Sequence, residues 1–160
     1  MRFCRLIGLG LIAFLLSACG GPDQQDATEK AAEPAADAIS VSDAELAGNP
    51  FLEEWDTPYG VPPFDAIEDS HYMPAIKKAV LDLRTEIDAI VNNPEPPTFE
   101  NTIVALELSG DMLQKVAATF GNITGTDTND ELRALESQIY PMLTREFDAI
   151  TMNDDLWQRV

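Results

Sequence analysis

Side chains that could do hydrolytic or metal chemistry are few in this chain of 160 residues. It contains one histidine, His71, and two cysteines, so a zinc site built from several histidines or cysteines cannot come from this sequence alone. His71 has no cysteine, serine or second histidine at a defined spacing, and local packing or capping at a helix start is the simpler role for it. The sequence has no H-E-x-x-H, no G-x-S-x-G and no glycine-rich phosphate loop. We therefore predict no catalytic residue and no metal ligand in it.

Acidic side chains dominate the charge of the chain. There are 28 aspartates and glutamates against 10 lysines and arginines, which gives a formal net charge of −18 at pH 7. This charge argues against a nucleic-acid partner, because binding to phosphates depends on lysine and arginine. Asp127, Asn129 and Glu131 begin like a calcium-binding loop. However, Leu132 stands where that loop needs glycine and Gln138 where it needs glutamate, so we interpret the acids as a helix cap with solvated neighbours.

A cysteine near the N-terminus lies in the context of a lipid-modification site. Two arginines precede an apolar run, residues 6–16, whose eleven residues are too few to cross the ~30 Å hydrocarbon core of a membrane. The run leads into Leu16-Ser17-Ala18-Cys19, which is typical of a bacterial lipobox; an ordinary secretory signal with an incidental cysteine is the alternative. We expect residues 1–18 to be a lipoprotein signal peptide and Cys19 to be lipidated and to anchor the chain at the membrane. Because Gly20 and not aspartate follows Cys19, the outer membrane, facing the periplasm, is the expected location in the cell envelope.

Two stretches of different composition follow the signal. Residues 19–48 contain few large apolar side chains, which predicts a flexible acidic linker because little burial can offset the entropy lost on ordering. Residues 49–64 have prolines at positions 50, 58, 62 and 63, which rule out a long helix. The large apolar side chains of this second stretch are Phe51, Leu52, Trp55, Tyr59 and Phe64. We expect them to pack as an extended strap on a helical body, with an ordered linker as the alternative.

The remainder of the chain has the periodicity of helices. A first helix is predicted to be capped by Asp69 or Ser70, to carry Pro74 in its first turn and to stop at residues 92–94. Its apolar stripe, at steps of three and four residues, is Ile76, Val80, Leu83, Ile87 and Ile90. A second helix, capped by Thr98, is predicted to present on one face Phe99, Ile103, Leu106, Leu113, Ala117 and Phe120. Gly110 lies on that face and predicts close approach by a neighbour or a local break.

Two more helices are predicted after a turn at residues 124–127. Thr128 and Glu131 have the spacing of a capping box that opens a third helix. Its inward residues are predicted to be Leu132, Leu135, Ile139, Leu143, Phe147 and Ile150, and Pro141 is expected to kink it. Asn153 begins a fourth helix that reaches the last residue, so we expect the sequence to end short of its natural domain. The predicted fold class is all-α, with antiparallel helices over residues 49–160.

Several motifs resemble one family of peptidases. Asn49-Pro50-Phe51-Leu52, Pro62-Pro63-Phe64-Asp65 and His71-Tyr72-Met73-Pro74-Ala75 are similar to the N-terminal region of the oligopeptidase A and thimet oligopeptidase family. The most specific stretch runs from Asn93 to Glu107. Residues 128–132 and 147–160 are similar to the peptidyl-dipeptidase branch in particular. The resemblance covers residues 49–160, with the motifs in the right order.

The resemblance implies the N-terminal lobe of a thermolysin-like (neurolysin-like) zinc metallopeptidase. Such enzymes are almost wholly helical, and their two lobes enclose a channel that admits short peptides; the peptidyl-dipeptidase branch releases C-terminal dipeptides. Their zinc is held by an H-E-x-x-H helix and a glutamate that lie far beyond the matching residues. No catalytic or zinc-binding position can therefore be carried over, and this chain alone is expected to be inactive. The alternative is a free-standing helical lipoprotein that binds a peptide or protein partner without chemistry.

Overall fold

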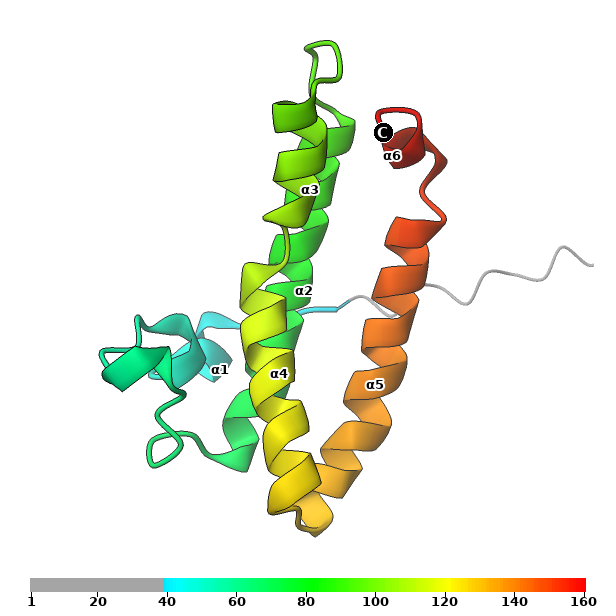
Figure 1. Cartoon of the computed structure of the whole chain (residues 1–160). Helices are drawn as coiled ribbons and strands as arrows, with labels where there is room; N and C mark the ends of the chain where they lie inside the picture. The colour runs from blue at the N-terminus through cyan, green and yellow to red at the C-terminus, as the bar shows by residue number, and fades with distance from the viewer. Residues whose placement is uncertain (1–38) are drawn as a thin grey trace, which may run out of the picture. The chain divides into compact units, whose positions relative to one another are not determined.

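The computed structural model describes residues 39–160, so the predicted signal peptide, Cys19 and most of the predicted linker lie outside the described residues. All regular structure in the described part is helical, which confirms the predicted all-α class. The elements are α1 (Asp43–Leu46), η1 (Pro50–Leu52), η2 (Pro58–Gly60), α2 (Asp69–Val91), η3 (Phe99–Val104), α3 (Ala105–Glu107), α4 (Asp111–Thr126), α5 (Asp130–Thr151) and α6 (Asp154–Trp157) (Figure 1). None of the helices within residues 39–160 combines the length and apolar character needed to cross a membrane.

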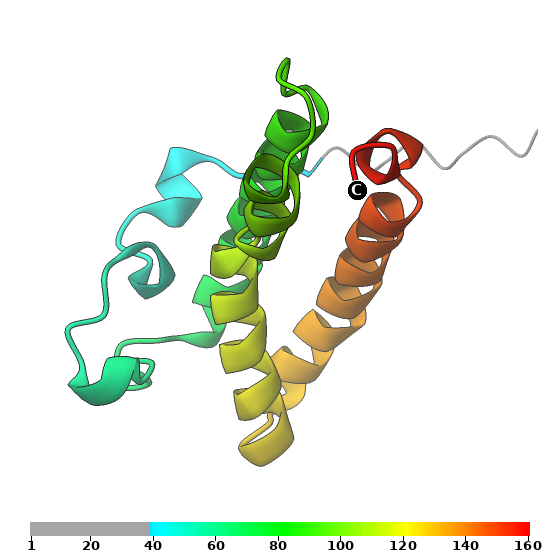
Figure 2. The same cartoon turned by 45° about the horizontal axis from the view of Figure 1, so that its top comes forward.

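The central helix of this part is α2, and its predicted apolar stripe is buried. It ends before Asn92, as predicted, but it begins one residue early, because Glu68 and not Asp69 or Ser70 occupies the N-cap position. Both α4 and α5 contact α2 and each other. They lie close together beside the turn that joins them and diverge toward their other ends (Figure 1, Figure 2). The core therefore forms along α2, between two helices that spread apart.

The second predicted helix is broken, and Gly110 is where it breaks. Gly110 has a φ of +77°, a left-handed conformation that glycine adopts without strain. An added Cβ at Gly110 would lie 3.3 Å from Leu83 Cδ1, so the position also allows the close approach that the sequence indicates. Both interpretations of this glycine are confirmed, and the single helix expected from Thr98 to Phe120 is wrong.

The first piece of that helix, η3, is a π-helix, which the predicted 3.6-residue period does not describe. Thr98 is its N-cap, as predicted, since its Oγ1 accepts a hydrogen bond from Asn101 N–H at 3.1 Å. In this segment Thr102 is buried, whereas Phe99, predicted to point inward, is 66% exposed.

The last two helices follow the prediction in outline. The third predicted helix is α5, but its N-cap is Asn129 and not Thr128, because Asn129 Oδ1 accepts a hydrogen bond from Leu132 N–H at 2.8 Å. The helix continues through Pro141 to Thr151, and the turn expected to start at residue 124 starts later because α4 extends to Thr126. Asn153 caps α6, as predicted. Phe147, expected inward, is 53% exposed, which is a further correction.

The proline-rich segment of residues 49–64, which we call the lead-in, packs only in its first half. Phe51 is buried in the core and Trp55 packs against it. Tyr59 and Phe64 are exposed, and the backbone forms two single-turn helices, η1 and η2, so the strap over residues 49–64 is not confirmed as predicted. In addition, α1 lies within the range predicted to be flexible linker and contacts α2. The ordered part of the chain thus begins before Asn49.

Candidate functional site

Cys19, the modification site predicted from the sequence, lies outside the described residues, so its lipidation stays a prediction. His71 is in the first turn of α2, where its Nδ1 accepts a hydrogen bond from Glu68 N–H at 3.0 Å. This contact confirms the local capping role. Within residues 39–160, no three histidine, cysteine, aspartate or glutamate side chains lie close enough together to hold a metal ion. The described residues therefore do not fit a zinc centre.

The start of α2 holds the lead-in through a buried asparagine. Asn49 is 1% exposed, and its Nδ2 donates a hydrogen bond to His71 O at 2.9 Å. Its Oδ1 accepts from Phe51 N–H at 3.1 Å. Two of the motifs that carry the family resemblance thus contact each other across 22 residues of sequence. Their visible role is to fix the lead-in to α2, because a buried amide stabilises only an arrangement that satisfies both of its ends.

A continuous row of aromatic rings extends from this anchor across the helices. The ring centroids of Phe51 and Tyr72 are 5.3 Å apart, those of Tyr72 and Phe120 5.1 Å, and those of Phe120 and Tyr140 6.0 Å. All three pairs are tilted, an arrangement that aromatic quadrupoles favour. The row joins η1, α2, α4 and α5 at one end of α2, where Phe51, Tyr72 and Phe120 are buried and Tyr140 is 45% exposed.

Lys115 of α4 also contacts the lead-in, and we call these contacts the Lys115 clamp. Its Nζ lies 3.9 Å from the centroid of the Trp55 ring and donates to Phe51 O at 3.3 Å and Glu53 O at 3.2 Å. Partial burial lowers the pKa of Lys115, since the charged form loses hydration. Its contacts are with backbone carbonyls and a ring face, which indicates a structural cation.

The proline-rich connection after α2 is held from the C-terminal segment. Arg159 donates through Nη1 to Asn93 O at 2.9 Å and through Nη2 to Glu95 O at 3.2 Å. Asn101 completes the connection, because its Nδ2 donates to Pro96 O at 3.0 Å and its Oδ1 accepts from Thr98 N–H at 2.8 Å. The stretch with the most specific resemblance thus forms a loop held by side-chain hydrogen bonds and the capped start of η3.

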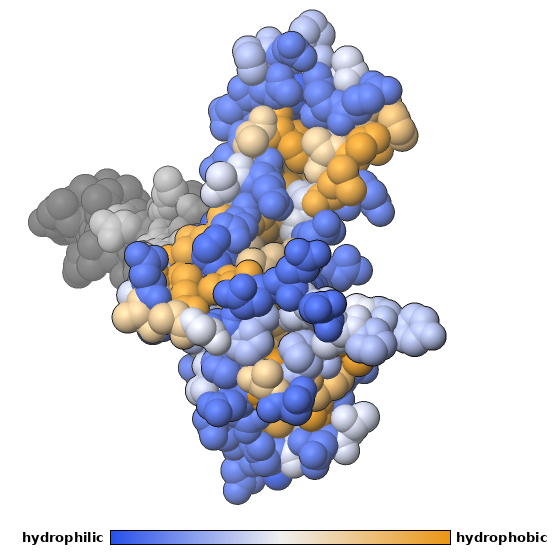
Figure 3. Space-filling model, turned by 90° about the vertical axis from the view of Figure 1, so that its left-hand side faces the viewer, coloured by the Kyte–Doolittle hydropathy of each residue, from blue (hydrophilic) through white to orange (hydrophobic). Residues whose placement is uncertain are grey.

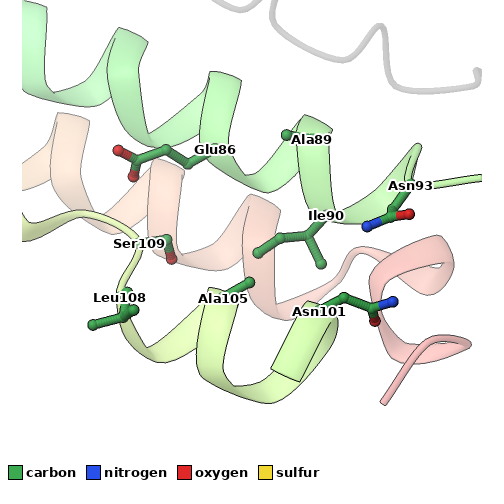
Figure 4. A pocket seen from close by; sticks show the side chains of 8 residues that line it. All are labelled: Glu86, Ala89, Ile90, Asn93, Asn101, Ala105, Leu108 and Ser109. Atoms are coloured by element: carbon green, nitrogen blue, oxygen red, sulfur yellow. The ribbon is translucent and has the colours of Figure 1, made fainter. Parts of the chain in front are cut away.

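A first hollow lies between α2 and the η3–α3 segment (Figure 4). It has a volume of about 410 Å³, and its lining includes Glu86, Ile90, Asn101 and Leu108. The polar side chains in it already have partners within the chain. Glu86 Oε2 accepts from Gly110 N–H at 2.7 Å, and Asn101 binds the loop described above. This hollow has an internal structural function and presents no catalytic arrangement.

A second hollow, of about 490 Å³, is the groove between α2, α3, α4 and α5. Its lining is mainly apolar and includes Leu83, Ile87, Leu113, Ala117, Phe147 and Ile150. Ser109 Oγ, at its edge, donates to Leu106 O at 2.7 Å. The lining contains no titratable side chain, so this groove can bind apolar side chains and has no group for proton transfer.

An ion pair beside the groove ties two of its walls together. Arg84 of α2 donates through Nε to Glu146 Oε2 at 2.7 Å and through Nη2 to Glu146 Oε1 at 2.5 Å. The hydrogen bonds and charge of Glu146 raise the pKa of Arg84. Sequence reasoning missed this pair because the partners are 62 residues apart and no local spacing predicts it.

Comparison with known proteins gives this geometry a context. No family model matches the chain. The dipeptidyl carboxypeptidase of Salmonella typhimurium (strain LT2) is 42% identical over 115 residues, which are 72% of this chain and 17% of the relative. That of Escherichia coli (strain K12) is 43% identical over 112 residues, 70% of this chain and 16% of the relative. The oligopeptidase A of Salmonella typhimurium is 28% identical over 109 residues, 68% of this chain and 15% of the relative.

Identity at this level, over more than two thirds of the chain, places it in a class of peptidases. The chain belongs to the family that contains the dipeptidyl carboxypeptidases and oligopeptidases A, and it is more similar to these dipeptidyl carboxypeptidases than to these oligopeptidases. The resemblance to the peptidyl-dipeptidase branch is therefore confirmed. The chain spans about one sixth of the length of the dipeptidyl carboxypeptidases that it matches.

Proposed function

We propose that this chain is the N-terminal region of a lipid-anchored zinc peptidase that degrades short peptides and releases C-terminal dipeptides. The observation that carries the proposal is the identity of 42% and 43% to two proteins named dipeptidyl carboxypeptidase. Zinc is part of the proposal through the family resemblance alone, because the described residues do not fit a zinc centre. The metal ligands and the catalytic groups belong to the portion outside this sequence.

In this proposal the described helices form part of the wall around a peptide channel and do not perform chemistry. The contacts described above support this role. The aromatic row, the Lys115 clamp and the Arg159 contacts all join backbone segments to one another, which makes the region rigid. A rigid wall restricts the channel to flexible, short peptides, because a folded protein cannot enter it.

Activity of a chimera tests the proposal. The 160-residue chain is joined to the portion of the Escherichia coli dipeptidyl carboxypeptidase that follows its matched segment, and release of dipeptides from a short synthetic peptide is measured. We expect the chimera to release dipeptides and to lose this activity with a zinc chelator. The chain alone is expected to release none, with or without added zinc. A chimera that melts cooperatively but has no activity contradicts the proposal, and so does dipeptide release by the chain alone.

The membrane anchor needs a separate test. Cys19→Ser removes the thiol that would be acylated, and we expect it to abolish incorporation of a clickable palmitate analogue and partitioning into the detergent phase. Cys4→Ser is the matched control, because Cys4 lies in the segment that signal processing would remove, so it should label like the wild type. Equal labelling of Cys19→Ser and the wild type would show that Cys19 is not the lipidated residue.

A further inference from the structure

We propose that the groove between α2, α4 and α5 is the seat of one amphipathic helix from the portion of the enzyme outside this sequence. The inference rests on the proposed function, since it takes this chain as one region of a longer peptidase. The occupant is defined by its chemistry as a helix with one apolar stripe that covers Phe147 and Ile150 on one side and Leu113 and Ala117 on the other.

The lining of the groove is that of an incomplete helical core. Leu83 and Ile87 of α2 form its floor and are 5% and 4% exposed. Phe147, on the α5 wall, is 53% exposed although its neighbour Glu146 is buried. Covering the exposed half of the Phe147 ring would remove apolar surface from water, so a helix seated here would stabilise the fold.

The walls have the geometry that one more helix needs. Helices α4 and α5 both contact α2 and diverge away from the turn that joins them (Figure 1), and the groove is lined by residues of all three. A further helix between them, opposite α2, gives four helices around one core, the arrangement of a helix bundle. Ala117 and Gly110 on one wall are small, which permits the 8–10 Å distance between axes of packed helices. The Arg84–Glu146 pair joins α2 to α5 beside the groove.

The lengths of the relatives and the charge of the chain indicate which occupant fits. The chain covers only 16–17% of the dipeptidyl carboxypeptidases, so most of the residues that could cover the groove lie in the other five sixths of such a protein. A second copy is a poor occupant, because two chains of formal charge −18 repel each other. The same charge favours a helix with lysine or arginine beside its apolar stripe.

Cysteine labelling tests the proposal directly, because the chain has no cysteine after Cys19. Phe147→Cys places a thiol in the groove, and Ser137→Cys places one on an exposed part of the same helix. Both are made in the full chain carrying Cys4→Ser and Cys19→Ser, and in the chimera described above. The rate of reaction with a maleimide is followed by mass spectrometry of the peptide that contains each position. We expect the Phe147→Cys thiol to react at least tenfold more slowly in the chimera than in the chain alone, and the Ser137→Cys thiol to react within twofold in both.

Each outcome decides the proposal. If the Phe147→Cys thiol reacts equally fast in both proteins, no helix covers the groove; should that chimera still release dipeptides, the inference fails while the proposed function stands. Protection in a chimera without activity supports the covered groove and counts against the proposed chemistry. Protection in the chain alone that grows with concentration assigns the groove to a second copy and overturns the proposal. If the chimera does not fold, a cysteine at the position of Escherichia coli dipeptidyl carboxypeptidase aligned with Phe147 is used, and the proposal requires that thiol to react only after unfolding.

Discussion

The two ends of α2 differ in how completely their apolar side chains are covered. Around its start, the rings of Phe51, Tyr72 and Phe120 are 1–2% exposed and touch each other through η1, α2 and α4. Around its second half, Phe99 of η3 is 66% exposed, and Phe147 is 53% exposed although α5 contacts α2. The three rings around the start are covered within this chain, and we call this the closed end and the other the open end. The second end has apolar surface of the kind that a further element would bury. Figure 3 shows, on the side of the lead-in, that apolar side chains reach the surface in separate patches among hydrophilic ones.

The largest expected effect comes from breaking the closed end. Phe120→Ala removes the ring between Tyr72 and Tyr140, which no neighbouring segment can replace, and should lower the free energy of unfolding by about 3–5 kcal/mol. Urea unfolding of the chain followed by circular dichroism measures it. Phe99→Ala, the same substitution at an exposed position, is the control and should cost less than about 1 kcal/mol. Equal losses for the two variants would mean that the ends are not packed differently.

Alkaline pH should weaken the closed end specifically. Burial, with a contribution from the charge of Asp69, raises the pKa of Tyr72 from 10.0 to about 12. Between pH 10 and about pH 12 the folded state therefore keeps the phenol proton that the unfolded state has lost, and stability falls as the pH rises. Since one pKa unit corresponds to about 1.4 kcal/mol, the loss approaches about 2–3 kcal/mol.

The control for this pH dependence is Tyr72→Phe, which keeps the ring and removes the titrating group. Urea midpoints measured from pH 9 upward should fall more steeply for the wild type than for this variant. The lowered pKa of Lys115 works in the opposite direction, because its stabilisation rises with pH, but it is common to both proteins and cancels in the difference. Identical slopes would show that Tyr72 titrates while the protein is folded as it does when unfolded.

Signals that act within one helical turn were predictable at both ends. The stripe of α2 follows the 3.6-residue period, and Thr98 and Asn153 cap the helices assigned to them, because these signals act within one turn. At the open end the same period failed for Phe99, since a π-helix shifts side chains relative to an α-helix and leaves no distinct apolar spacing in the sequence. The prediction that Tyr59 packs on the helices failed for another reason. A high density of aromatic residues indicates burial, but the Tyr59 side chain is fully exposed and its backbone lies in a left-handed turn with φ of 63°.

The candidate site was less predictable than the fold. The sequence indicated that Phe147 faces inward, whereas it is 53% exposed on the α5 wall of the groove, and only the arrangement of α4 and α5 explains this. The Arg84–Glu146 pair joins residues whose distance along the chain hides their contact. The role of His71 was correctly predicted because capping is local.

The junction between the two ends can be tested with a pair of glycines. Gly110→Ala forces a Cβ into a left-handed conformation and to within 3.3 Å of Leu83 Cδ1, so it should destabilise the chain by about 1–2 kcal/mol. Gly121→Ala lies within α4 with no atom within 4 Å of the new Cβ, so it should stabilise by up to about 1 kcal/mol. Thermal melting should therefore shift in opposite directions. A shift in the same direction for both would show that the break at Gly110 does not need its left-handed backbone.

The smallest change in the free energy of unfolding is expected at the open end, because the side chain replaced there is largely exposed in the chain alone. Phe147→Gln replaces a ring that is 53% exposed on the α5 wall, so the free energy of unfolding of the chain should change by no more than about 0.5 kcal/mol. The variant should also bind less of an apolar fluorescent dye than the wild type, because the groove loses its most exposed apolar member. A loss as large as that of Phe120→Ala would mean that the groove closes on itself in solution and that Phe147 is already buried. In the chimera the same substitution should cost about 1.5–3 kcal/mol, since the ring would there be covered. The difference between the two proteins measures how far the open end depends on what packs against it.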